Sequence, residues 1–83
     1  MMIVTNIVPC IKITKENNSM GMEQYIEYDE KIKIEYNGTI VKGFLKNYLI
    51  EENKEVIVLE LQDGGILKIN PIEIEDIECI SHF

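Results

Sequence analysis

Cys79 and His82 stand three positions apart near the end of the chain, with the C-x-x-H spacing of zinc ligands. Cys10 is the only other cysteine or histidine in the sequence. A zinc ion needs three or four ligands that a second layer of hydrogen bonds holds in place. His82 is the penultimate residue, and chain ends fray. We therefore expect no metal site, and we expect Cys79 to be buried on a closing strand.

A serine nucleophile would have to use the same histidine as its base. Ser81 and His82 are neighbours, and neighbours on a strand point to opposite faces, so they cannot form a dyad. Asp63-Gly64-Gly65 has the glycine content of a phosphate loop, but this composition between two apolar runs is typical of a hairpin turn. We expect no catalytic residues, no enzyme activity and no cofactor.

The composition excludes other functional classes. The chain has 83 residues, of which 15 are acidic and 8 are basic, so its net charge is -7. All the basic residues are lysine, which removes the bidentate arginine that reads phosphates and guanine. Four lysines and three aromatic residues fall between positions 31 and 48. We expect these aromatics to fill the core and do not expect a nucleic acid as a partner.

The net charge is confined to the end of the chain. Residues 1–50 hold 6 acidic and 6 basic side chains, whereas residues 51–83 hold 9 acidic and 2 basic ones. Four carboxylates crowd around the isoleucines near the C-terminus, namely Glu73, Glu75, Asp76 and Glu78. We predict that these four residues bind a partner with a basic surface. The alternative, a solvated rim around a closing strand, stays open at this point.

Strand patterns must position these residues. Residues 3–14 form an apolar block in which Ile11 and Ile13 alternate with polar neighbours, the period of a half-buried strand. Pro9 makes this block an edge strand, or two short strands with a bend between them. Residues 15–21 are polar and predict a loop. Residues 22–30 are ambiguous between strand and loop.

The clearest local signal is a hairpin between residues 31 and 45. Both arms alternate, and the Asn37-Gly38 pair between them is typical of a type I′ turn. Gly43 predicts a bend in the second arm. Glu35 is a carboxylate that could relieve the repulsion between facing lysines. The implied register pairs Tyr36 with Thr39, Ile34 with Val41, Lys33 with Lys42 and Ile32 with Gly43.

The remaining elements follow at short intervals. Residues 51–55 predict a charged turn, residues 56–61 and 66–69 predict strands, residues 71–76 contain a 3-10 turn, and residues 77–81 predict the last strand. We expect one mainly β domain over residues 1–83. It comprises an N-terminal strand segment (1–14), a loop and lead-in (15–30) and a small barrel (31–81).

This order of elements resembles the Sm-like and Src-homology-3-like small barrels. The resemblance implies a five-stranded, strongly bent antiparallel barrel, here with an extra N-terminal strand and one short 3-10 turn. Sm-like proteins commonly bind RNA as rings. This chain has neither their aspartate near Asn47 nor their basic glycine motif near Pro71. The resemblance covers residues 31–81 and rests on residues 32–38, 43–48, 56–61 and 69–80.

From these observations we expect a non-catalytic protein-interaction module. Its partner is a protein, which includes a second copy that docks through the N-terminal strand or an open sheet edge. The alternatives are an acidic inhibitor that mimics a nucleic acid, of the mobile-element type, and an Sm-like RNA-binding protein. No apolar run is long enough to span a membrane and no secretory signal is visible, so we expect a cytoplasmic location with reduced cysteines.

Overall fold

The structure of the chain is a computed structural model that describes residues 2–7, 10–17 and 20–83. Strands make up most of these residues, and the mainly β class is confirmed. The elements in chain order are β1 (Met2–Asn6), β2 (Cys10–Asn17), β3 (Met20–Glu27), β4 (Lys31–Tyr36), β5 (Thr39–Glu51), β6 (Lys54–Leu61), β7 (Ile66–Ile69), the 3-10 turn η1 (Pro71–Glu73) and β8 (Ile74–Cys79).

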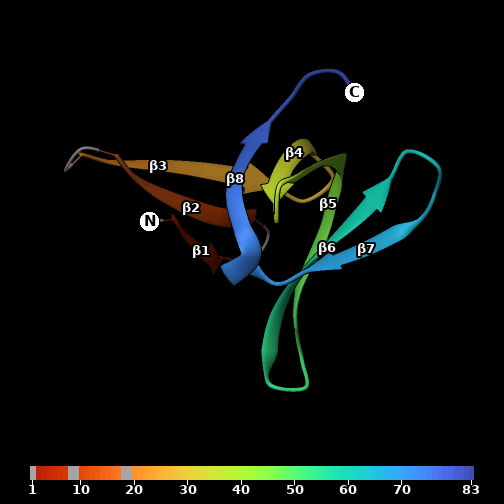
Figure 1. Cartoon of the computed structure of the whole chain (residues 1–83), viewed down its shortest axis with the longest axis horizontal. Coiled ribbons are helices and arrows are strands. Elements are labelled where there is room, and N and C mark those ends of the chain that lie inside the picture. The colour runs from red at the N-terminus through yellow and green to blue at the C-terminus, as the bar shows by residue number, and fades with distance from the viewer. Residues whose placement is uncertain (1, 8–9, 18–19) are drawn as a thin grey trace.

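The strands form two antiparallel sheets (Figure 1). The first sheet has the order β1-β2-β3, and the second has the order β7-β6-β5-β4-β8. The strand pairs of the described residues do not join β7 to β8, so the second sheet stays open where we expected a closed barrel.

The open sheet is covered by the N-terminal strands. Ile11, Ile13 and Ile26 of the first sheet are fully buried in one cluster with residues of the second sheet, such as Ile34 and Leu45. We expected one extra N-terminal strand. Instead, β1, β2 and β3 form a second layer that packs on the five-stranded sheet. Apolar residues of that layer pack against the inner face of the five-stranded sheet, and burial of the two facing surfaces stabilises the pair of sheets.

The segment that we expected as a loop and lead-in, residues 15–30, is mostly strand. β2 and β3 pair from Cys10 opposite Glu27 to Asn17 opposite Met20. Apolar and polar residues alternate only near Ile11 and Ile26. Beyond them, the backbone pairing of β2 with β3 continues through polar residues that do not show this pattern. Pro9 lies outside the described residues, but strands on either side of it, β1 and β2, pair as a hairpin.

The hairpin of β4 and β5 confirms the sequence prediction. Asn37 and Gly38 have φ of 48° and 75°, as a type I′ turn requires. The four predicted pairs, from Tyr36 with Thr39 to Ile32 with Gly43, are the observed pairs. A second turn of this kind joins β5 to β6, where Glu52 and Asn53 have φ of 49° and 67°.

β5 is a long strand that serves two partners in succession. Residues 39–44 pair with β4, and the register with β6 runs from Gly43 to Glu51 with an irregularity between Leu45 and Asn47. Gly43 lies where the two pairing segments overlap, opposite both Ile32 of β4 and Leu61 of β6. A Cβ at Gly43 would stand 2.6 Å from the carbonyl oxygen of Glu60. The predicted bend at Gly43 is thus a point where two backbones approach closely.

The C-terminal elements are of the predicted types, but their bounds differ from the predicted ones. The predicted 3-10 turn is present as η1, where the side chain of Asn70 accepts a hydrogen bond from the backbone N–H of Ile72 at 3.0 Å. β8 begins at Ile74 rather than at residue 77, because Ile74 and Ile77 are both buried against the core.

Candidate functional site

The structure separates the four carboxylates that the sequence singled out. Glu73 belongs to η1 and is exposed, whereas the other three residues lie on β8. Glu75 falls at an irregularity in the pairing of β8 with β4, and its Oε1 accepts a hydrogen bond from the backbone N–H of Gly38 at 3.1 Å. Only Asp76 and Glu78 share one face of the strand, since they are two residues apart.

The face that Asp76 and Glu78 share also carries lysines. Lys33 stands between Lys42 on β5 and Glu78 on β8, and its Nζ lies 2.6 Å from Glu78 Oε1. The hydrogen bond and the charge of Glu78 raise the pKa of Lys33. We expected Glu35 to relieve the lysine pair. Glu35 pairs with Asp76 on β8, and the charges of both carboxylates add smaller contributions to the raised pKa of Lys33. This face is therefore a mixed ladder of charges and not an acidic surface.

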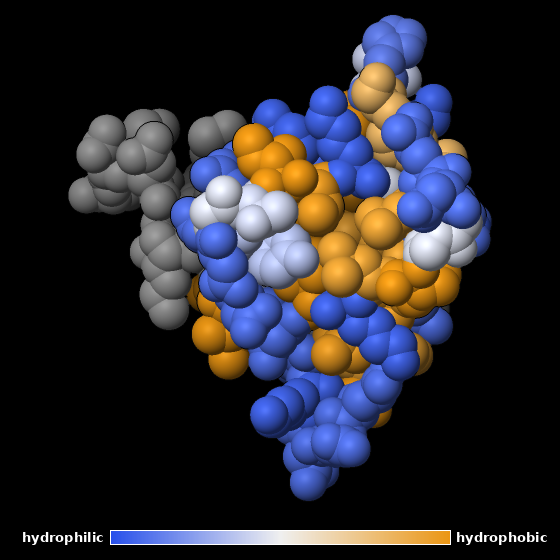
Figure 2. Space-filling model, turned by 45° about the vertical axis from the view of Figure 1, so that its right-hand side comes forward, coloured by the Kyte–Doolittle hydropathy of each residue, from blue (hydrophilic) through white to orange (hydrophobic). Residues whose placement is uncertain are grey.

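A groove of about 560 Å³ opens elsewhere, between β1 and the free end of the β5–β6 hairpin. We call it the edge groove. Figure 2 shows that apolar surface gathers on one face of the molecule and is bordered by hydrophilic side chains. The residues that line the edge groove are Val4, Thr5, Asn6, Tyr48, Leu49, Ile50 and Glu55.

The edge groove runs along strand edges and not along one sheet face. Three consecutive residues of β1 and three of β5 line it, and consecutive strand residues point to opposite faces. β1 pairs with β2, and residues 47–51 of β5 pair with β6. In the strand pairs of the described residues, neither segment has a second neighbour. Both segments therefore lie at the edges of their sheets, where a further strand could pair. The Tyr48 N–H already donates to Asn47 Oδ1 at 2.8 Å, and Asn6 has further contacts of its own, so the open positions are at the other residues.

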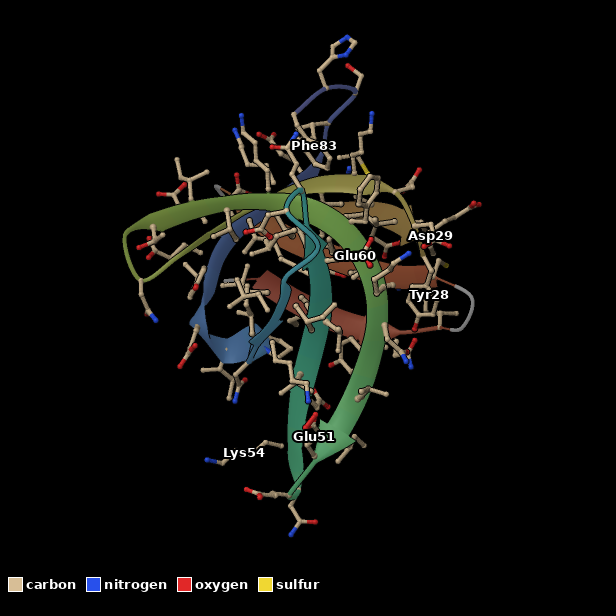
Figure 3. All side chains as sticks on the ribbon, turned by 90° about the vertical axis from the view of Figure 1, so that its right-hand side faces the viewer. Tyr28, Asp29, Glu51, Lys54, Glu60 and Phe83 are labelled. Atoms are coloured by element: carbon tan, nitrogen blue, oxygen red, sulfur yellow. The ribbon has the colours of Figure 1, made fainter. Side chains whose placement is uncertain are left out.

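Polar groups of the β5–β6 hairpin form one wall of the edge groove. The buried Tyr48 donates a hydrogen bond from its hydroxyl to Glu55 Oε2. Burial, together with this contact, raises the pKa of Tyr48, so the hydroxyl keeps its proton at neutral pH. Figure 3 shows Glu51 and Lys54 at the far end of the hairpin, where Lys68 of β7 binds Glu51 at 2.6 Å.

Exposed apolar side chains surround this end of the molecule. Leu49 and Ile50 are 36% and 72% exposed, and Ile72 of η1 is 90% exposed. Ile72 lines a second hollow of about 360 Å³, which also includes Glu55. Glu55 is therefore common to both hollows and stands among exposed apolar groups.

Sequence reasoning missed the edge groove because its two walls are more than 40 positions apart in the chain. One signal was present. Tyr48, Leu49 and Ile50 are three successive apolar residues, and neighbours on a strand point to opposite faces, so at least one of them must face outward.

Cys79 and His82 were first considered as zinc ligands. Within residues 2–7, 10–17 and 20–83, no group of three or more histidine, cysteine, aspartate or glutamate side chains could hold a metal ion. The same part of the chain holds no helix that is long and apolar enough to cross a membrane. Comparison of the chain with protein-family models, with curated proteins and with solved structures found no match.

Cys79 is exposed, and the expectation that it is buried was wrong. It ends β8 opposite Ile32, on the edge strand of the second sheet. Its Sγ lies 3.4 Å from Glu30 Oε2, to which it donates a hydrogen bond. Partial burial and the Glu30 carboxylate raise the pKa of the Cys79 thiol from 9.0 to about 11.

This shift predicts a loss of stability in alkali. Between about pH 9 and pH 11 the thiol loses its proton in the unfolded chain but keeps it in the folded chain. We expect the free energy of unfolding to fall over this range, and to fall less in Cys79→Ser. Urea unfolding at several pH values measures both slopes. Tyr28 and Tyr48 titrate in both proteins, so their effect cancels, and equal slopes would contradict the prediction.

Proposed function

We propose that the chain is a non-catalytic protein-interaction module whose partner docks at the edge groove. The observation that carries this proposal is the placement of Leu49 and Ile50, two exposed apolar residues, beside two strand edges without a second neighbour. Exposed apolar side chains beside the edge of a sheet are typical of a site where another protein binds.

Affinity capture tests this proposal. The immobilised chain is exposed to extract from its source cells, beside Ile50→Ser and Ile40→Ser, and bound proteins are identified by mass spectrometry. Ile40 is a matched control because it is also exposed, at 58%, but lies on β5 outside the edge groove. We expect a set of proteins that wild type and Ile40→Ser retain and Ile50→Ser loses. The same set on all three, or nothing beyond empty resin, would contradict the proposal.

We also propose that the five-stranded sheet is an open relative of the Sm-like and Src-homology-3-like barrels. Two observations support this. β8, the last strand, pairs with β4, the first strand of the sheet, and the turn η1 directly precedes β8. The likeness concerns architecture and brings no RNA-binding function with it.

The acidic-inhibitor alternative receives less support than the edge groove. It needs Glu73, Glu75, Asp76 and Glu78 to act as one anionic surface. Glu78 forms an ion pair with Lys33, and Glu75 accepts a hydrogen bond from Gly38. The charge of Asp76 also contributes to the raised pKa of Lys33. Three of the four carboxylates are thus engaged within the chain, which lowers the negative charge offered to a basic partner.

A further inference from the structure

The shape of the edge groove restricts what can occupy it. Val4 and Thr5 on one side, and Leu49 and Ile50 on the other, belong to strand segments that are paired on their far sides by β2 and β6. On an antiparallel edge strand, every second residue directs its N–H and C=O away from the existing partner. An occupant with its own unpaired backbone groups, in extended conformation, matches such an edge best.

We propose that the edge groove binds an extended, basic segment of a partner protein, which adds a strand along a free edge and places a lysine or arginine beside Glu55. This inference rests on the proposed function and names the chemistry of its partner. Successive side chains of the added strand point to opposite faces, so an apolar side chain beside Tyr48 alternates with residues that face solvent.

The position of Glu55 is the reason to expect a lysine or arginine in the bound segment. Tyr48 donates to one carboxylate oxygen, Oε2, and so fixes the carboxylate at the wall of the edge groove. The other oxygen remains as an acceptor for an incoming ammonium or guanidinium group. A hydrogen bond between ionised partners is stronger than one between neutral groups, and exposed Ile50 opposite Glu55 adds apolar contact for the stem of a lysine or arginine.

The net charge favours a basic partner over a second copy of the chain. The whole chain carries -7, and residues 51–83, which include Glu55, carry all of it. A second copy would bring the same charge to the contact and repel the first. A basic segment is attracted at long range and reaches the edge groove faster.

A library of random decapeptides displayed on phage serves as the probe, with the intact chain as bait. We expect the selected peptides to alternate apolar and polar residues and to share one lysine or arginine position. A selected peptide that is resynthesised with N-methylated backbone amides should lose binding, because strand addition needs those N–H groups. Selection of no peptide, or of peptides without a basic residue, would overturn the inference, as would unchanged binding after N-methylation.

Two glutamate variants sharpen the test. Glu55→Gln keeps an acceptor for Tyr48 but removes the charge, and it should weaken the peptide about 10-fold, as the loss of a charge-assisted hydrogen bond does. Glu52→Gln is the matched control, because it removes the same charge on the adjacent turn outside the edge groove. Equal affinities of the two variants would overturn the role of Glu55.

Other outcomes separate this inference from the proposed function. If affinity capture depends on Ile50 but no decapeptide binds, the module function stands and the added strand is wrong. If sedimentation shows a dimer that a selected peptide dissociates, a second copy is the occupant and the basic partner is wrong.

Discussion

Replacing Gly43 by alanine is expected to lower the free energy of unfolding by about 3 kcal/mol, as overpacking of a tight core does. The added Cβ would stand 2.6 Å from the carbonyl oxygen of Glu60 and 3.2 Å from its carbonyl carbon. Glu60 cannot move aside easily, because it pairs with Phe44 on one side and with Ile66 on the other. Domains of this size are stable by roughly 4–12 kcal/mol in total, so the loss is a large fraction.

Gly65→Ala is the control for Gly43→Ala. A Cβ at Gly65 would stand 3.0 Å from Asp63 Oδ1, the end of an exposed side chain that can shift at the cost of its hydrogen bond from the Gly65 N–H. We expect it to cost less than about 1 kcal/mol. Urea unfolding followed by far-ultraviolet circular dichroism measures both variants. If both variants lost the same free energy of unfolding, the close approach of the Glu60 carbonyl to Gly43 would not be the cause of the loss.

Replacing Ile13 by alanine is expected to cost about 2–5 kcal/mol, the range for a buried isoleucine that leaves a cavity. Ile13 is fully buried in a cluster that draws on both sheets. Removing its side chain from β2 should therefore destabilise the whole molecule in one cooperative transition. Sheets that fold independently would instead give two transitions, of which only one shifts.

Ile72→Ala is the matched control for Ile13→Ala, because Ile72 is 90% exposed. It should change the free energy of unfolding by no more than about 0.5 kcal/mol. Equilibrium unfolding in urea, followed by circular dichroism and by tyrosine fluorescence, reports the number of transitions. An Ile13→Ala protein as stable as Ile72→Ala would mean that the first sheet does not stabilise the second.

Local signals predicted several elements of the second sheet, but not that the sheet stays open. The Asn37-Gly38 turn carries its own backbone preference, and it fixed the register of β4 with β5 down to Lys33 opposite Lys42. The strand of residues 66–69 and the 3-10 turn were also predicted, because two glycines precede the strand and Pro71 marks the start of the turn. Each of these features depends on residues close in sequence, where short-range sterics decide the conformation.

The candidate site was harder to predict for the opposite reason. The carboxylates of residues 73–78 form a cluster in sequence, but strand geometry and the irregularity at Glu75 send them in different directions. The ion pair of Glu78 with Lys33 depends on the pairing of β8 with β4, which closes a long loop that no local pattern encodes. The contacts of each carboxylate follow from that pairing.

By itself, the sequence determined the β class, one hairpin register, the 3-10 turn and the confinement of net charge to the last 33 residues. Only the tertiary structure decided that the N-terminal strands form a second layer and that Val4 and Tyr48 meet at one groove. The physical reason is the range of the interactions. Turn preferences act over a few residues, whereas burial of Ile13 against the second sheet brings together segments that are far apart along the chain.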